Sequence, residues 1–211
     1  MTSDILVVGA GGHCRVVLSI LFHYKEFNII GIADRNNESI GEEILGIKVK
    51  YSWNDFSKLY NKGVNNAVLA VGDNVQRKKL FKELISIGFS IKSIIHPSSI
   101  VSESANISDG TTICMGAKIG PLVSILENCI IYSGSIIEHE TIIEKNSFVA
   151  PGVSIAGRVK IESSSFIGIG CSIKEGIKIG KNSIIGAGSV VINDIKSNST
   201  VVGVPAKYIK N

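Results

Sequence analysis

The chain has 211 residues, with 22 basic and 18 acidic side chains and a formal net charge of +4. This small excess forms no basic block, which argues against nucleic-acid binding and leaves room for small phosphate-bearing ligands. No apolar run approaches the ~18 residues of a membrane span, and no leader pattern opens the chain, so we expect no membrane insertion and a cytoplasmic location. The spacing of Cys14, Cys114, Cys129 and Cys171 matches no metal motif and predicts reduced thiols and no metal site.

The first ninety residues alternate apolar runs with amphipathic segments. This alternation predicts a small parallel α/β domain of Rossmann type over residues 1–93. The expected order is a strand at 5–8, a helix at 13–24, a strand at 29–33, a helix at 54–61, a strand at 67–71, a helix at 75–87 and a strand at 91–95.

A glycine turn, GAGGHC at residues 9–14, joins the first strand to the first helix. Backbone N–H groups and the positive end of the helix dipole predict a phosphate site there. Asp34 ends the second strand where a ribose-binding acid would lie, so dinucleotide binding is one interpretation. Cys14 replaces the last glycine of that fingerprint, and a tight turn without any ligand is another interpretation.

A second turn, Gly72-Asp73-Asn74, follows the strand predicted at 67–71. Ligands of open α/β sheets bind at the carboxyl ends of strands, so we expect both turns to line one crevice. Simple helix capping by Asp73 and Asn74 is an equally good interpretation. The predicted substrate-binding residues are Gly11, Gly12, His13, Asp34, Arg35, Gly72 and Asn74.

A six-residue repeat dominates the rest of the chain. From Ile95 to Val191 every sixth residue is Ile or Val, in seventeen positions of which fourteen are Ile. This period is typical of a parallel β-helix, which we predict over residues 94–211 together with a C-terminal tail. Three residues after each ladder position, ten of the seventeen residues are Gly or Asn, which accept positive φ at a corner.

His139 lies inside the repeat, between Glu138 and Glu140. A neutral imidazole can take a proton from an amine or a hydroxyl, and an adjacent carboxylate raises its basicity and fixes its tautomer. A histidine beside two acids is also typical of a solvated surface. The pattern alone leaves both interpretations open.

The tail carries the sequence GVPAK at residues 203–207, which resembles the terminal signature of hexapeptide-repeat acyltransferases. Together with the GAGGH turn and the repeat, it makes the whole chain resemble the family of sugar O- and N-acetyltransferases that includes PglD- and NeuD-type enzymes. The resemblance implies a left-handed β-helix, a homotrimer and acetyl-CoA bound along the seam between subunits. It also implies that the first domain binds a nucleotide-linked amino sugar through Gly11, Gly12, His13, Asp34 and Arg35.

The family's Ile-Glu-His-Glu motif matches residues 137–140, which implies that His139 is the general base and that Glu140 raises its basicity. The residues implied to contact acetyl-CoA are Phe148, Gly157, Ile169, Ala187, Pro205 and Lys207, with Lys210 as a further phosphate contact. One position departs from the family: PglD-type sequences often carry Ser-His-Val where this chain has Ser147-Phe148-Val149.

These features predict an acetyl-CoA-dependent N-acetyltransferase that acts on the amine of a nucleotide-linked amino sugar, a precursor of surface glycans. Transfer would be direct, with an N–H group such as that of Gly157 stabilising the oxyanion. An O-acetyltransferase of sialic acid or a related sugar shares all of these motifs and is the alternative. A non-catalytic β-helix scaffold is a third interpretation, and it requires neither His139 nor the tail.

Overall fold

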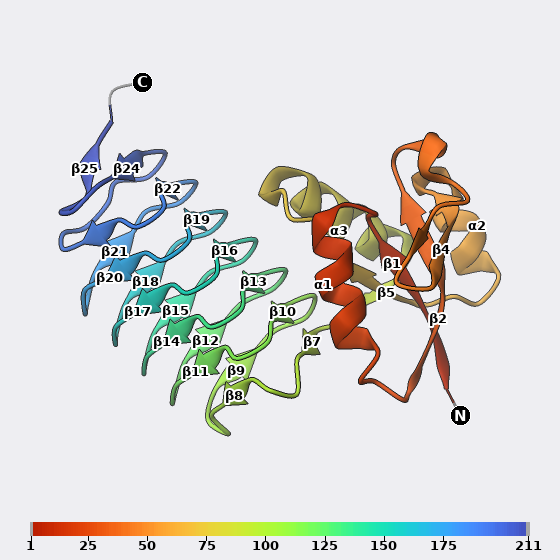
Figure 1. Cartoon of the computed structure of the whole chain (residues 1–211), viewed down its shortest axis with the longest axis horizontal. Helices are drawn as coiled ribbons and strands as arrows, with labels where there is room; N and C mark the ends of the chain where they lie inside the picture. The colour runs from red at the N-terminus through yellow and green to blue at the C-terminus, as the bar shows by residue number, and fades with distance from the viewer. Residues whose placement is uncertain (1, 210–211) are drawn as a thin grey trace. The chain divides into compact units, whose positions relative to one another are not determined.

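The computed structural model describes residues 2–209. The chain forms two compact units, Met1–Ile94 and Ile95–Asn211 (Figure 1). Each has its own hydrophobic core. Within residues 2–209, none of the helices combines the length and the apolar character that a membrane span requires.

The first unit is a six-stranded sheet with the order β3-β4-β2-β1-β5-β6, parallel except for the β3–β4 pair. Its strands are β1 (Ser3–Val8), β2 (Phe27–Asp34), β3 (Glu43–Ile44), β4 (Ile47–Ser52), β5 (Asn66–Leu69) and β6 (Ser90–Ile91). Its helices are α1 (Gly12–Leu21), α2 (Phe56–Asn61) and α3 (Asn74–Ile87), with short 3-10 turns at Asn37–Ser39 and Trp53–Asp55. Because β1 pairs with both β2 and β5, the turns that follow β1 and β5 lie side by side at the carboxyl edge of the sheet.

Two expectations for this unit were wrong. β3 and β4 were not predicted, although Ile47, Val49 and Tyr51 of β4 alternate with lysine and serine, a pattern typical of a strand. The strand expected at 91–95 is two strands in different sheets. Ser90–Ile91 pairs with β5, whereas Ile94–Ile95 belongs to a sheet formed by strands of the second unit, and the polar pair Lys92-Ser93 separates the two strands.

Each of the seventeen ladder residues ends a two-residue strand in the second unit. These strands form three flat walls. Wall 1 contains β7 (Ile94–Ile95), β10 (Thr112–Ile113), β13 (Ile130–Ile131), β16 (Phe148–Val149), β19 (Phe166–Ile167) and β22 (Ile184–Ile185). Wall 2 contains β8 (Ile100–Val101), β11 (Lys118–Ile119), β14 (Ile136–Ile137), β17 (Ser154–Ile155), β20 (Ser172–Ile173) and β23 (Val190–Val191). Wall 3 contains β9 (Asn106–Ile107), β12 (Ser124–Ile125), β15 (Ile142–Ile143), β18 (Lys160–Ile161) and β21 (Lys178–Ile179).

The walls stack as parallel strands. Ser154 of β17, for example, pairs with Ser172 of β20, so each coil of the chain lies directly on the one before (Figure 1). Wall 1 is extended by β24 (Thr200–Val202), and the tail returns along it as the antiparallel strand β25 (Lys207–Tyr208). The Ile and Val ladder points inward, and most of it is fully buried. β-branched side chains pack well on such flat walls.

Small polar side chains tie successive coils together at the corners. The hydroxyl of Thr141 donates to the carbonyl of Ala156 at 3.1 Å, and that of Ser165 donates to the carbonyl of Gly180 at 3.0 Å. Both pairs span fifteen residues, so each bond joins one coil to the next. Thr141 and Ser165 each lie two residues before a ladder residue, and small hydroxyl side chains at this position satisfy buried carbonyl groups while occupying little space.

Candidate active site

His139 and Glu140 stand on the corner between wall 2 and wall 3, which we call the 2–3 corner. The Nδ1 atom of His139 lies 3.0 Å from Oε2 of Glu140. The two side chains are 45% and 48% exposed, so the ring is accessible while one of its nitrogens is engaged. A carboxylate at Nδ1 favours a proton on that nitrogen, which leaves Nε2 as the atom that can accept one.

The imidazole of His139 lies against Gly157, which occupies the same corner position one coil further on. A Cβ placed on Gly157 would lie 2.5 Å from both Cε1 and Nε2 of the ring. Such a contact is far inside van der Waals distance, so only glycine leaves room for the ring here. Gly157 is buried, whereas the ring that covers it is open to solvent on its outer side.

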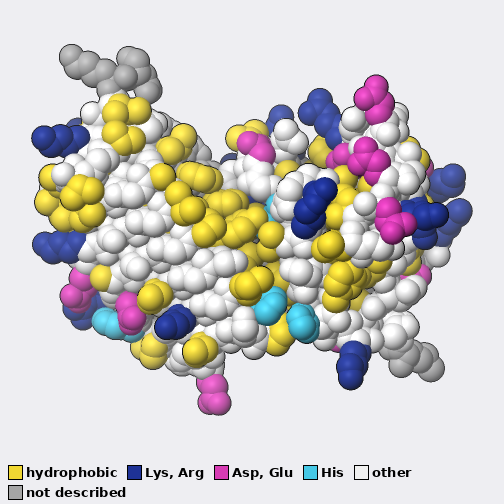
Figure 2. Space-filling view, in the orientation of Figure 1, with side chains coloured by type: hydrophobic (Ala, Val, Ile, Leu, Met, Phe, Trp, Pro, Cys, Tyr) yellow, Lys and Arg dark blue, Asp and Glu magenta, His cyan; other side chains and the backbone are white. Residues whose placement is uncertain are grey.

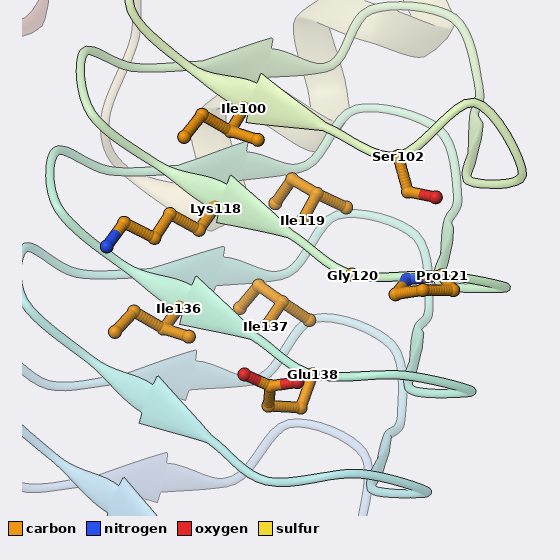
Figure 3. Close-up of a pocket in the computed structure, with 9 residues that line it drawn as sticks. All are labelled: Ile100, Ser102, Lys118, Ile119, Gly120, Pro121, Ile136, Ile137 and Glu138. Carbon is orange, nitrogen blue, oxygen red and sulfur yellow. The ribbon is translucent and has the colours of Figure 1, made fainter.

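A groove of about 280 Å³ on the outer face of wall 2 ends at this corner (Figure 3). Ile100, Lys118 and Ile136 form one column along it, and Ser102, Pro121 and Glu138 lie toward the corner. His139 directly follows Glu138, so the groove leads to the candidate base. These residues were not predicted to line a site, although the position before each ladder residue predicts an outward-facing side chain.

The glycine turn of the first unit follows β1 and lies beside Asp34 of the neighbouring strand β2. Gly11 precedes α1, and Gly11 and Gly12 are exposed. The N–H of Ala10 donates to Oδ1 of Asp34 at 3.4 Å, while Oδ2 of Asp34 accepts from the hydroxyl of Ser39 at 3.0 Å. Asp34 therefore braces the turn, and the turn presents the exposed backbone of a helix N-terminus beside it.

His13 lies inside this turn and is only 7% exposed. Burial lowers the pKa of His13 to about 4, and the nearby positive charge of Arg77 acts in the same direction. The ring is therefore neutral at physiological pH. It packs near Gly72, where a Cβ would lie 4.0 Å from the Cβ of His13, which brings the two predicted turns together. Arg35 follows β2 and is exposed.

Capping explains Asp73, and a buried arginine engages Asn74. The carboxylate of Asp73 accepts from the N–H of Gln76 at 2.7 Å at the start of α3. Arg77 is 1% exposed, and it donates to the carbonyl of Gly72 at 3.0 Å and to the side-chain oxygen of Asn74 at 2.7 Å. Arg77 thus fixes the shape of the second turn from beneath.

The residues predicted to contact acetyl-CoA lie in separate places on the second unit. Gly157 is on the 2–3 corner, whereas Ile169 and Ala187 are exposed on the corner between walls 1 and 2. Pro205 and Lys207 are exposed in the tail beside β24. Lys210 lies outside the described residues. Wall 2 separates Gly157 from Ile169 and Ala187 within one chain.

Phe148 faces outward from wall 1 and is 9% exposed. Its ring lies between those of Tyr132 and Phe166, with centroid distances of 5.4 and 5.0 Å. Such pairs contribute about 0.5–1.5 kcal/mol beyond area burial. Figure 2 shows hydrophobic side chains gathered over β13, β16, β19 and β22. Ile184, the strand partner of Phe166, is half-exposed and extends this apolar surface. The aromatic residue that departs from the family pattern is therefore integrated into an apolar surface.

No thiol in the described chain is placed for nucleophilic catalysis. Cys14, Cys114, Cys129 and Cys171 are buried, and burial raises the pKa of Cys14 and Cys114 to about 12. A thiolate is the reactive form of cysteine, so these groups are inert at neutral pH. Among residues 2–209, no group of three or more His, Cys, Asp or Glu side chains is arranged to hold a metal ion.

Comparisons with known proteins place this geometry in context. Residues 4–84 match the family model described as PglD N-terminal domain, and residues 158–193 match the one described as bacterial transferase hexapeptide (six repeats). The structure of PerB from Caulobacter crescentus in complex with CoA and GDP-perosamine is 30% identical, with a TM-score of 0.93, and the match covers 100% of this chain and 99% of PerB.

Two further solved structures are similar to this chain over nearly its whole length. A histidine-to-asparagine mutant of perosamine N-acetyltransferase from Caulobacter crescentus, in complex with CoA and GDP-perosamine, is 29% identical over 100% of this chain and 99% of its own, with a TM-score of 0.94. The acetyltransferase domain of PglB from Neisseria gonorrhoeae is 25% identical over 99% of this chain and 100% of its own, with a TM-score of 0.92.

The α/β unit followed by a left-handed parallel β-helix defines the protein as an acyltransferase of the hexapeptide-repeat class. The chain belongs to the PglD-like family of nucleotide-sugar acetyltransferases. The resemblance expected from the GAGGH turn, the repeat and the GVPAK tail is confirmed, and the interpretation as a non-catalytic scaffold was wrong.

Proposed function

We propose that the protein transfers an acetyl group from acetyl-CoA to the amine of a nucleotide-linked amino sugar, with His139 as the general base. The observation that carries this proposal is the pairing of an exposed imidazole with Glu140 at the end of the wall 2 groove. Relatives that cover the whole chain bind CoA and GDP-perosamine, which supports this pair of substrates. Two of those structures carry asparagine or alanine in place of a histidine, which supports a role for histidine in the family.

In the proposed reaction, Nε2 of His139 accepts the proton that the sugar amine loses as its nitrogen forms a bond to the thioester carbon. Glu140 holds Nδ1 and stabilises the imidazolium that results. The backbone N–H of Gly157 is our candidate donor to the oxyanion, because the ring of His139 lies against this residue. The C–S bond then breaks, CoA leaves as the thiolate, and the proton passes from His139 to solvent. No enzyme nucleophile is needed.

The two parts of the chain divide this work in our proposal. Residues 1–93 bind the nucleotide of the sugar, and residues 94–211 bind acetyl-CoA and carry out transfer. The exposed N-terminus of α1 suits a diphosphate, and in our proposal Asp34, Arg35, Gly72 and Asn74 contact the nucleotide sugar at the carboxyl edge of the sheet. The neutral ring of His13 adds no charge to this site.

A complete acetyl-CoA site requires two copies of the chain in our proposal. Gly157 and the Ile169–Ala187 pair lie on opposite edges of wall 2, so one ligand contacts all of them only where two subunits meet. A homotrimer has such a boundary between each pair of neighbouring subunits, and Pro205 and Lys207 of the tail would also contact acetyl-CoA there. Light scattering of the purified chain should give three times the mass of 22.5 kDa. A monomeric mass would contradict this arrangement.

We place the reaction in the cytoplasm, where thiols stay reduced, and its product among the precursors of surface glycans. The direct test follows thiol release from acetyl-CoA with a panel of acceptors: UDP-4-amino sugars, GDP-perosamine and free sialic acid. We expect release with an amino-sugar nucleotide, together with a product heavier by one acetyl group. Release with sialic acid alone would support the O-acetyltransferase alternative and contradict the proposal.

A further inference from the structure

The residues that turn the chain at the 2–3 corner differ from those at the other two corners. At the corner between walls 1 and 2, the residues with positive φ are all glycine, at positions 116, 134, 152, 170 and 188. At the corner between walls 3 and 1, they are Gly, Asn or Ser. At the 2–3 corner, three successive coils turn at Leu122, Glu140 and Arg158, with φ values of 59°, 59° and 57°, and the next coil turns at Gly176.

This choice of residues is unfavourable for the backbone. The left-handed conformation costs a residue with a Cβ about 1–2 kcal/mol, and glycine or asparagine avoids most of that cost. The fold itself shows that Gly or Asn can make the same turn, because they do so at most of the other corners. At Glu140 and Arg158, the side chain makes contacts that Gly or Asn at the same position would not supply. Glu140 contacts His139, and Arg158 occupies the same position one coil further on.

Arg158 engages both the candidate base and the next coil. Its backbone N–H donates to the carbonyl of His139 at 2.9 Å, and its guanidinium forms an ion pair with the carboxylate of Glu175. Both side chains are largely exposed, at 60% and 49%, so the pair contributes little to stability. A stabilising role does not explain why a strained position carries this arginine.

The position of Glu175 supplies a reason. His139, Gly157 and Glu175 occupy the same corner position on three successive coils, and the N–H of Gly176 donates to the carbonyl of Gly157 at 3.0 Å. The imidazole covers Gly157, and Cε1 and Nε2 are the ring atoms nearest to the position of a Cβ on that glycine. Coils are spaced by about 4.8 Å, so the flexible side chain of an unrestrained Glu175 can reach the Nε2 edge of the ring.

We propose that Arg158 is a positioning residue for proton transfer: it holds the carboxylate of Glu175 away from Nε2 of His139. This inference rests on the proposed function, in which Nε2 must carry a lone pair. With Glu140 at Nδ1 and a second carboxylate at Nε2, the ring would be held as an imidazolium, which cannot accept the proton of an amine. The charged side chains on this corner from the coil of Ile119 to that of Ile173 are Glu138, Glu140, Arg158, Lys174 and Glu175.

The test compares Arg158→Ala, Arg158→Lys and the double variant Arg158→Ala/Glu175→Gln with the unmodified protein. We expect Arg158→Ala to lower kcat at pH 7 about 10-fold, a smaller fall than the loss of a general base causes. KM for both substrates should change less than about 2-fold. Raising the pH to 9 should recover most of this loss, because it deprotonates the ring. Arg158→Lys should keep most of the activity, and Glu175→Gln should restore the activity lost in Arg158→Ala.

The matched control is Lys178→Ala, which breaks the 2.9 Å ion pair with Glu162 on wall 3. This variant should leave both kcat and KM unchanged.

A second readout needs no substrate. The ¹⁵N signals of histidine-labelled protein, with His139 assigned by His139→Gln, should show a larger fraction of doubly protonated ring in Arg158→Ala at pH 7.5. The double variant should return to the unmodified pattern. This measurement separates the inference from the proposed function, since it stands even if no acceptor in the panel is acetylated. An unchanged His139 signal in Arg158→Ala would overturn the inference. The inference would also be overturned if Arg158→Ala raised KM for either substrate and Glu175→Gln did not restore it. That result would show that Arg158 binds a substrate phosphate.

Discussion

The imidazole of His139 fills the space that any side chain on Gly157 would occupy. The two residues are one coil apart, and the repeat that builds the wall also sets their spacing. The ring of this candidate base is thereby held on two sides, by Gly157 beneath it and by Glu140 at Nδ1. A general base is effective only when its position is fixed, so these contacts define the chemistry that the corner can perform.

Gly157→Ala should therefore displace the ring without unfolding the coil. The added Cβ would lie 2.5 Å from Nε2, and the half-exposed ring is free to swing outward. We expect kcat to fall by about 100-fold or more, as for loss of a general base, while the thermal midpoint changes little. Ser133→Ala, at the equivalent position of another corner, is the control and should keep full activity. Equal activity of both variants would show that the ring works from another position.

Glu140→Asn should separate stability from activity. Asparagine tolerates the positive φ of 59° at this position, so the free energy of unfolding should rise by about 1 kcal/mol. Turnover should fall about 10-fold, because Nδ1 of His139 loses its carboxylate partner. Leu122→Asn, at the same corner one coil earlier, should give a similar gain in stability with activity retained. Calorimetry and thiol release on the same samples provide both values, and a stable, fully active Glu140→Asn would contradict the role given to Glu140.

The buried corner hydroxyls should matter for stability alone. Ser165 is fully buried and donates to the carbonyl of Gly180, so Ser165→Ala leaves a buried acceptor without this donor. The expected loss is about 1–2 kcal/mol in the free energy of unfolding. Circular dichroism during thermal unfolding measures it, with Ser163→Ala on the same corner as the less buried control. Equal midpoints for the two variants would show that the hydroxyl serves only to save space.

The first unit should lose stability in mild acid through His13. Its pKa is about 4 in the folded protein, against 6.5 for an unperturbed histidine, so the unfolded chain binds a proton more readily between these values. The free energy of unfolding should then fall as the pH drops below 6.5, by about 2 kcal/mol from pH 7 to pH 5. The fluorescence of Trp53, the single tryptophan, reports urea unfolding of this unit. His13→Gln should flatten the pH dependence. A slope unchanged by this variant would assign the effect to other groups.

Periodicity made much of this fold predictable. The six-residue ladder located all seventeen short strands, because each coil repeats the same local chemistry. The exchange of partners at Ile94 and the short strand β3 were not predictable, since they depend on which strand lies alongside and not on local pattern.

The candidate site also has features that the sequence predicted and features that it did not. His139 and Glu140 were identified by motif, and the structure brings them together. The ion pair of Arg158 with Glu175 and the fit of the ring on Gly157 join residues 17 or 18 positions apart on neighbouring coils. One signal in the sequence does point to Arg158: it occupies a turn position where the repeat usually has Gly or Asn.

The most direct test of the account is the turnover of His139→Ala with acetyl-CoA and the best amino-sugar nucleotide of the panel. We expect kcat to fall by about 100-fold or more, with KM for acetyl-CoA little changed, because the ring serves proton transfer and not binding. Turnover within about 2-fold of the unmodified protein would contradict the account, since a general base cannot be removed at so small a cost.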